Sequence, residues 1–364
     1  MAFSSIDPAV RERLLEPPTG KVSVVLDSDM ANEIDDQFAL AWALLTPDTI
    51  ELKAVIAEPF SFAHHRSPLL EVEQLRATSG RADLASAERL TLLEEYGAWL
   101  DRLESQGTSP ADLTFVTPAE GVDLSVAESE RVYAAAGLDP NGLVFRGADR
   151  YMPDAETPVA SDGVDRLVEL ARESVEPLYV AAIGCITNVA SALLLAPDIV
   201  DKIVVLWTSG YPSNDDRSNL PSLNLVQDVH AARVVLDSGV PFVYMPGYLI
   251  GQRLTVSQPE MQAWVKGTGP LGELLFDLYD NNPLFPMLGF EGHFCRTWVI
   301  WDLICIAWLV DPALVPTVIR PTPELGDDLR WDLGNSAGRH MMREAIAIDR
   351  DGVFRDLFTK LAEQ

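Results

Sequence analysis

A short apolar segment near the start of the chain sets the fold class. Residues 21–26, Lys-Val-Ser-Val-Val-Leu, form a β-branched run typical of a buried strand. A helical pattern follows from about Ile34 to Leu45, and Pro47 ends it. Residues 51–57 form the next strand-like run. A chain that begins strand-loop-helix-strand indicates a parallel sheet. We therefore predict an α/β fold, with an open, mostly parallel twisted sheet flanked by helices.

The same alternation continues along the chain. Further strands are predicted at 177–183, 203–208 and 241–245, and further helices at 188–195, 228–237 and 351–363. Residues 68–140 interrupt the alternation with a highly charged, mostly helical stretch. We interpret residues 1–364 as one domain with a Rossmann-like core, and residues 68–140 as a helical region inserted into it.

The composition argues against several classes of protein. The chain carries 55 acidic and 27 basic residues, for a formal net charge of -28. Such a charge repels phosphate backbones and anionic lipids, so we expect no nucleic-acid and no membrane partner. Cys185, Cys295 and Cys305 are an odd number of cysteines without CxxC spacing, and the N-terminal segment has no apolar signal core. We therefore expect reduced thiols in a cytoplasmic protein.

Four aspartates gather around the end of the first strand. Asp27 and Asp29 follow the strand at its carboxyl end, and Asp35 and Asp36 open the next helix. Ligand sites of open α/β sheets lie at this edge, and carboxylates crowded there repel one another unless a cation neutralises them. All-oxygen ligands favour Ca²⁺ or Mg²⁺ over zinc. Capping of a helix explains one or two acids, but not four with Glu33 beside them.

A fifth aspartate interrupts an apolar run late in the chain. Asp302 is the only charged residue of the segment 298–310, which we predict to be a buried helix. A lone buried carboxylate costs several kcal/mol unless it is paired or bound to a metal. A core aspartate bonded to the backbone or to an arginine would also fit. Beside the first cluster, a metal ligand is the better interpretation.

Two further segments carry polar groups near predicted strand ends. Residues 183–188, Ile-Gly-Cys-Ile-Thr-Asn, lead from a strand into a helix, which by itself is an ordinary turn. Asn224 follows a polar loop and is able to bind a hydroxyl group, whereas Asp228 is most simply the N-cap of the helix after it.

Together these residues resemble the inosine-uridine-preferring nucleoside hydrolase family. The resemblance covers about residues 21–60 and 140–310. It depends on the strand followed by DSD and IDDQFAL, on VFRGADRY, IGCITNVASALLLAP and SLNLVQDVHAARVVLDSGVP, and on the buried Asp302. It implies a calcium-dependent hydrolase that cleaves the bond between ribose and a base, and a homodimer or homotetramer.

The family motifs imply a role for each matching residue. Asp29 is expected to bind calcium and to act as the general base for water. The other calcium ligands implied are Asp36, Asp302 and the backbone carbonyl of Ile183. The resemblance implies that Asp35 binds the 2-hydroxyl of the ribose and that Asn224 also binds the sugar.

Some positions depart from the family pattern, and they leave the metal ligands in place while altering the groups that meet the substrate. The loop between Asp29 and Asp35 is two residues longer than usual, and Ser222 replaces a glutamate that holds the 5-hydroxyl. Trp301 stands where many members have a histidine, so the usual acid for the leaving base is absent or comes from elsewhere. We take Trp301 as a candidate to stack on the base and His293 as a candidate replacement acid, although such side chains are more often structural.

Two other functions stay open on the sequence alone. A non-catalytic, metal-dependent riboside-binding protein would explain the changed substrate ligands, but it leaves the retained Asp29 and Asp36 without a purpose. A phosphatase using Asp27 as nucleophile would leave the aspartate pair at the helix start unexplained. Hydrolysis requires a group able to activate water and negative charge near a sugar that becomes cationic, and the aspartate cluster offers both.

Overall fold

A central sheet of eight strands organises the computed structural model, which describes residues 6–78, 87–293, 296–332, 334 and 338–364. Its strand order is β3-β2-β1-β4-β5-β6-β12-β9. The bounds are β1 (Val22–Ser28), β2 (Ile50–Ala57), β3 (Val144–Arg146), β4 (Leu178–Ala182), β5 (Ile203–Ser209), β6 (Phe242–Pro246), β9 (Thr317–Pro321) and β12 (Met341–Ala345). Neighbouring strands of this sheet are parallel except β12 and β9. The predicted open, mostly parallel sheet is confirmed.

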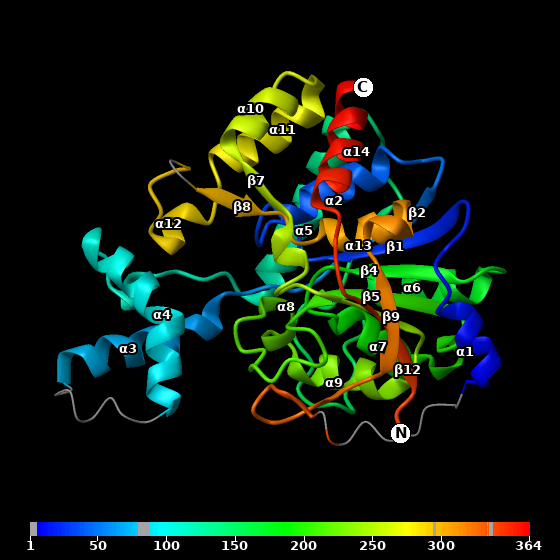
Figure 1. The fold of residues 1–364 in the computed structure, drawn as a ribbon, viewed down its shortest axis with the longest axis horizontal. Helices are drawn as coiled ribbons and strands as arrows, with labels where there is room; N and C mark the ends of the chain where they lie inside the picture. The colour runs from blue at the N-terminus through cyan, green and yellow to red at the C-terminus, as the bar shows by residue number, and fades with distance from the viewer. Residues whose placement is uncertain (1–5, 79–86, 294–295, 333, 335–337) are drawn as a thin grey trace.

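Helices cover both faces of the sheet (Figure 1). Alternate residues of β1 show the two faces, because Val24 and Leu26 belong to one apolar core and Val25 belongs to the other. The first core includes residues of α2 (Asp35–Leu44), α11 (Gly269–Asp280), α13 (Leu303–Val310) and α14 (Arg350–Ala362). The second includes residues of α6 (Asp162–Glu173), α7 (Thr187–Leu195) and α9 (Val229–Ser238). Residues buried on both faces explain why the central strands read as continuous apolar runs.

The remaining elements are short or lie outside the central layers. The helices are α1 (Pro8–Leu14), α3 (Arg66–Thr78), α4 (Ala87–Ser105), α5 (Pro118–Ala135), α8 (Leu223–Val226), α10 (Gln258–Trp264) and α12 (Phe285–Leu288). Short 3-10 turns are η1 (Ala63–His65), η2 (Pro110–Asp112), η3 (Pro197–Ile199), η4 (Gly251–Arg253) and η5 (Pro312–Leu314). Two small ribbons pair β7 (Thr255–Ser257) with β8 (Thr297–Val299), and β10 (Glu324–Leu325) with β11 (Trp331–Asp332).

The strand order places a crevice at the middle of the sheet. The chain runs outward from β1 to β2 and β3 on one side, and then from β4 to β5 and β6 on the other. The carboxyl ends of β1 and β4 therefore flank the point at which the order reverses, where open α/β sheets bind their ligands. The amide of Ile183, just after β4, donates to the carbonyl of Asp27 in β1 at 2.8 Å.

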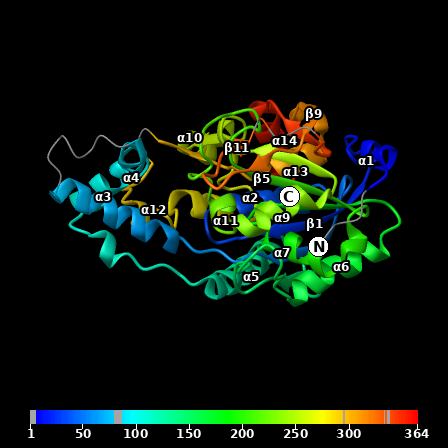
Figure 2. The same cartoon turned by 90° about the horizontal axis from the view of Figure 1, so that it is seen from below.

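Helices α3 and α4 project away from the sheet as a separate lobe (Figures 1 and 2). They pack around a small apolar cluster that includes Leu69, Trp99 and Leu103. The Trp99 indole donates to the carbonyl of Met287 in α12 at 2.8 Å. Helix α5 instead packs against α2, β2 and β3 of the main body. The lobe proper therefore consists of α3 and α4, while the division of the chain into a domain and an insertion at 68–140 stays a prediction.

One predicted helix is shorter in the structure. The apolar run 298–310 does not form a single helix, because Trp298 and Val299 belong to β8, where Val299 pairs with Thr255 and Trp298 pairs with Val256. The helix starts only at Leu303, with Asp302 as its N-cap residue. Within the described parts of the chain, no helix is long and apolar enough to cross a membrane.

Candidate metal and substrate site

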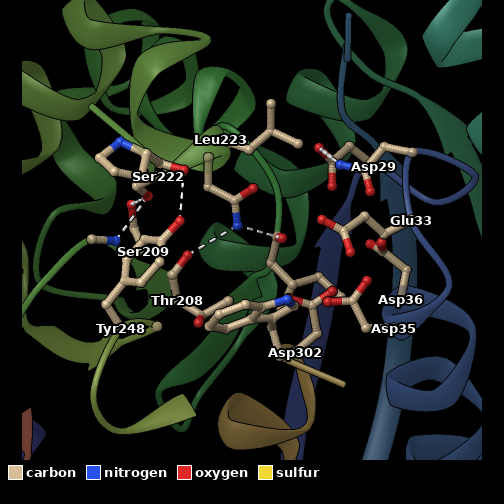
Figure 3. Close-up of a pocket in the computed structure, with 17 residues that line it drawn as sticks. Asp29, Glu33, Asp35, Asp36, Thr208, Ser209, Ser222, Leu223, Tyr248 and Asp302 are labelled. Atoms are coloured by element: carbon tan, nitrogen blue, oxygen red, sulfur yellow. Dashed lines mark hydrogen bonds between the residues drawn. The ribbon is translucent and has the colours of Figure 1, made fainter. Parts of the chain in front are cut away.

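A pocket opens at the crevice between the carboxyl ends of β1, β4 and β5 (Figure 3). The loop after β1 and the start of α2 supply carboxylates along one side, where Figure 3 shows Asp29, Glu33, Asp35 and Asp36 together. Backbone, hydroxyl and aromatic groups after β5 and β6 line the other side. No lysine, arginine or histidine lines the pocket among the described residues, so the pocket suits a cation and a neutral ligand rather than a phosphate.

Three buried carboxylates converge on one point of this pocket. Asp35, Asp36 and Asp302 each offer an oxygen atom, and these atoms all lie within 4.8 Å of one another. The side chain of Asp36 accepts a 2.6 Å hydrogen bond from Ser28 at its Oδ1, while its buried Oδ2 has no hydrogen-bond partner. Because α2 starts at Asp35, its first turn brings the neighbouring aspartates to the end of β1.

Asp29 lines the same pocket with one oxygen held and one free. Its Oδ2 accepts a 2.5 Å hydrogen bond from Asn32 Nδ2 and a longer one of 3.4 Å from Gln227 Nε2. Its Oδ1 is buried without a hydrogen-bond partner. The backbone at Gly184 passes so close that a Cβ there would lie 3.0 Å from the Asp29 carboxyl, which explains why glycine follows Ile183.

The electrostatics of the cluster favour a bound cation. Burial, and then the charge of Asp35, raises the pKa of Asp29 to about 8, and burial raises the pKa of Asp35 to about 6. Burial and the neighbouring aspartates raise the pKa of both Asp36 and Asp302 well above the usual range. Carboxylates with unpartnered oxygens and mutual repulsion match the ligand set of a hard divalent cation. The residues present therefore fit a metal ion.

Asn224 joins two carbonyl groups at the centre of the pocket. It lies in α8, and its Nδ2 donates to the carbonyl of Ile183 at 2.8 Å and to the carbonyl of Thr208 at 3.0 Å. The carbonyl of Ile183 was predicted as a metal ligand. A carbonyl oxygen has two lone pairs, so the hydrogen bond from Asn224 leaves one of them for a cation.

Hydroxyl and aromatic groups form the wall opposite the carboxylates. The Ser222 hydroxyl is engaged by the amide of Gly210 at 2.8 Å and lies 2.9 Å from the Ser209 hydroxyl. Trp301 lines the pocket beside Tyr248, with ring centroids 5.5 Å apart in an edge arrangement. The rings give the pocket aromatic surface, and a planar group is able to stack on the face of one of them.

The structure does not bring His293 to this pocket. Its imidazole is buried, stacks on the ring of Tyr279 at 4.2 Å and contacts the Tyr279 carbonyl through Nε2. Burial also lowers the pKa of His293. The His293 side chain therefore packs within an aromatic cluster. Its closeness to Asp302 in the sequence does not indicate which way the side chain points. The pocket is lined by all the other predicted site residues, which are Asp29, Asp35, Asp36, Ile183, Asn224, Trp301 and Asp302.

Several residues at or behind the site have no obvious sequence signal. Asn32 and Gln227 hold Asp29, as described above. Glu58 lies fully buried behind the pocket, where it accepts a hydrogen bond from the amide of Asn188 at 3.0 Å. The Asn188 side chain donates in turn to Asp27 at 2.9 Å. Asp27 therefore belongs to a layer beneath the pocket, which argues against its use as a nucleophile.

The fold and the site define a class of α/β protein with a carboxylate-rich pocket, whose residues fit a metal ion, at the sheet's switch point. The family model described as inosine-uridine preferring nucleoside hydrolase matches residues 62–354. The chain belongs to this family. The matched segment starts after the first aspartate cluster, which the pocket joins to Asp302 in space.

Related proteins carry names of the same kind. The chain is 27% identical over 309 residues to the pyrimidine-specific ribonucleoside hydrolase RihA of Enterobacter sp. (strain 638), covering 82% of each chain. It is 30% identical over 192 residues to the pyrimidine-specific ribonucleoside hydrolase RihB of Escherichia coli O1:K1 / APEC. That match covers 52% of this chain and spans 57% of the length of its relative, and a match to a relative from Shigella dysenteriae spans 66% of that protein.

Solved structures share the fold at low sequence identity. An inosine-uridine preferring nucleoside hydrolase from Bacillus anthracis superposes with a TM-score of 0.59 at 14% identity, covering 94% of this chain and 100% of the other. A purine-preferring ribonucleoside hydrolase from Gardnerella vaginalis gives 0.58 at 16% identity, with coverages of 94% and 98%. These similarities show that the chain has the nucleoside hydrolase fold.

Proposed function

We propose that this protein hydrolyses the N-glycosidic bond of a ribonucleoside or a related riboside, releasing the base and ribose, and that it depends on calcium. One observation carries the proposal. In a chain of this family, buried aspartates with unpartnered oxygens line one pocket at the switch point of the sheet. The names of the relatives, which refer to ribonucleosides, support the substrate class.

The metal ligands that we propose are Asp29, Asp36 and Asp302 with the carbonyl of Ile183. Asp35 shares the same small region with Asp36 and Asp302, and we assign it to the sugar hydroxyls. When bound, calcium would neutralise the carboxylates, orient sugar hydroxyls and lower the pKa of a water molecule. Calcium is preferred over magnesium because its longer bonds and flexible geometry suit a site built from several loops and strand ends.

The chain's own groups supply the remaining chemistry. The free Oδ1 of Asp29 is placed to accept a proton from water, because its other oxygen is already bonded to Asn32 and Gln227. Cleavage of the bond leaves positive charge near the anomeric carbon of the sugar. The surrounding carboxylates stabilise that charge because they are fixed in a buried site before the reaction.

The departing base meets different groups. No histidine lines the pocket among the residues that the structure describes, so we assign no side chain as its acid. Trp301 and Tyr248 both line the pocket and supply its aromatic rings. We propose that the base stacks on Trp301. Because no side chain is assigned as an acid, we expect bases that leave without protonation to react fastest.

The test is release of base and reducing sugar from a panel of purine and pyrimidine ribonucleosides, with calcium and with chelator. Hydrolysis that is lost with chelator and in Asp29→Asn supports the proposal. Tight binding of calcium and of a riboside without turnover would support instead a non-catalytic riboside-binding protein. One observation favours this second function. The Ser222 hydroxyl stands where the family has a sugar-binding glutamate, but it is already hydrogen-bonded to Gly210 and Ser209 within the protein.

Oligomeric state and cellular location complete the proposal. We propose a homodimer or homotetramer in the cytoplasm, as expected from the family resemblance and the cysteine content. Cys185 and Cys305 are buried free thiols, in keeping with a reducing compartment, and Cys295 lies outside the described residues. Light scattering at several concentrations measures the assembly.

A further inference from the structure

Gln227 lies directly behind Asp29 and bonds to three separate parts of the chain. It follows α8, and its side chain is buried. Its Oε1 accepts hydrogen bonds from the amide of Ser61 at 2.8 Å and from the hydroxyl of Tyr151 at 2.7 Å. Its Nε2 donates to Oδ2 of Asp29 at 3.4 Å. No other side chain is bonded at once to Asp29 and to the loop after β2 among the described residues.

The two donors fix which way the amide of Gln227 points. A backbone N–H is only a donor, so the atom facing Ser61 must be the oxygen. The nitrogen of the same amide is therefore turned toward Asp29, where it meets an acceptor. The Tyr151 hydroxyl strengthens this orientation, because turning the amide over would place its nitrogen against the Ser61 amide and leave two buried donors facing each other.

The consequence is a division of labour between the two oxygens of Asp29. Asn32 Nδ2 and Gln227 Nε2 both point at Oδ2, while Oδ1 has no partner and is buried. Asn32 lies in the same loop as Asp29, where its backbone amide also donates to the Asp29 carbonyl, whereas Gln227 is bonded to Ser61 and Tyr151. Gln227 is thus the donor that connects Asp29 to the loop after β2 and to Tyr151, both outside the loop of Asp29.

We propose that Gln227, held by Tyr151 and the Ser61 amide, is a positioning residue that turns the free oxygen of Asp29 toward the reacting water and metal. The inference rests on the proposed function for its effect on turnover. Ser61 stands just before η1 and α3. The side-chain amide of Gln227 therefore also connects Asp29 to the base of the lobe formed by α3 and α4.

The experiment compares Gln227→Leu and Tyr151→Phe with a matched control, Gln258→Leu. Gln258 also bonds a carboxylate through its amide, Asp280 at 2.7 Å, but it lies in α10 outside the pocket. For each protein we would measure kcat and KM on the best nucleoside of the panel, calcium affinity by calorimetry, and Tm.

Misplacement of a reacting group by about 1 Å costs on the order of 100-fold in rate. We therefore expect Gln227→Leu to lower kcat by about 10-fold to 100-fold with KM changed by less than about 3-fold. Tyr151→Phe should lower kcat less than Gln227→Leu does, but by more than about twofold, because the Ser61 amide still holds the oxygen of Gln227 while the Tyr151 hydroxyl is lost. Gln258→Leu should keep the kcat of the wild type.

A kcat within about twofold of wild type in Gln227→Leu would overturn the proposal, because orientation of Asp29 would then not depend on this amide. If Gln227→Leu does not fold, Tyr151→Phe decides by the same criterion, since it removes only one hydroxyl group. If the wild type hydrolyses no member of the panel, the proposed function fails separately. Calcium affinity then decides, with a loss of about tenfold or more in Gln227→Leu supporting the positioning role and an unchanged affinity refuting it.

Discussion

Replacing Asp302 with asparagine should stabilise the metal-free protein while weakening its binding of calcium. Asp302 is buried at the start of α13, and its carboxylate lies within 4.8 Å of oxygen atoms of Asp35 and Asp36. Asparagine has nearly the same shape but carries no charge. A residue kept only for packing or capping would show no such opposition between stability and binding.

The size of the effect follows from the separation of the carboxylates. Two unit charges 4.8 Å apart repel by about 3.5 kcal/mol at an effective dielectric constant of about 20. Asp302 has two such neighbours, but the raised pKa values mean that protons already relieve part of the repulsion. We therefore expect Asp302→Asn to raise the free energy of unfolding in chelator by about 1–3 kcal/mol. Loss of one charged ligand should reduce calcium affinity by on the order of 100-fold.

Urea unfolding with chelator and with saturating calcium measures both effects. Calcium should stabilise the wild type by an amount that grows with its concentration above Kd, and should stabilise Asp302→Asn much less. Asp228→Asn is the control, because Asp228 is also buried but its carboxylate accepts hydrogen bonds from Met152, Thr187 and Ala231. It should destabilise the protein in both conditions. The reasoning is refuted if Asp302→Asn destabilises the metal-free protein, or if calcium stabilises it as much as the wild type.

Three further results are expected. Asn224→Ala should lower kcat/KM by on the order of 10-fold to 100-fold, because it removes the hydrogen bonds to the carbonyls of Ile183 and Thr208. Steady-state kinetics on the nucleoside panel measures the effect, and a change of less than twofold would argue against a role of Asn224 in the site. Trp99→Ala should lower the unfolding free energy of the lobe formed by α3 and α4, by about 3–5 kcal/mol if the lobe unfolds as one unit. The lobe should then be proteolysed faster than in the wild type, and an unchanged rate of proteolysis would contradict this packing. Burial lowers the pKa of His65 from 6.5 to about 3, so the unfolded lobe binds a proton that the folded lobe does not, and stability present above pH 6.5 is lost as the pH falls toward 3. His65→Gln should remove about 2 kcal/mol of this loss between pH 6.5 and pH 5, as followed by tryptophan fluorescence, and an unchanged acid transition would contradict the assignment.

The sequence predicted the framework because its pattern is local. The run before Asp27 and the pattern that follows Ile34 specify a strand and a helix within a few residues, and the order of such pieces implies a parallel sheet. The apolar run containing Asp302 was harder, since short apolar segments fit a strand or a helix equally well. Pairing with β7 decides that its first residues are extended.

The same contrast applies to the site. Asp29, Asp36 and Asp302 were predictable because ionised groups that follow or interrupt buried runs need a physical reason to be there. Gln227 was not, because its partners Ser61 and Tyr151 are 166 and 76 residues away in the chain. A glutamine at the end of a short helix is ordinary until the fold shows what it contacts. The direction of a side chain, as for His293, also depends on packing that the sequence does not reveal.

The most direct test of the account is hydrolysis in ¹⁸O-labelled water by the calcium-loaded protein, with mass analysis of both products. We predict one labelled oxygen in the ribose, none in the base, no requirement for phosphate, and loss of product formation in Asp29→Asn. Ribose formed at the wild-type rate by Asp29→Asn, or a sugar phosphate formed only when phosphate is present, would contradict it.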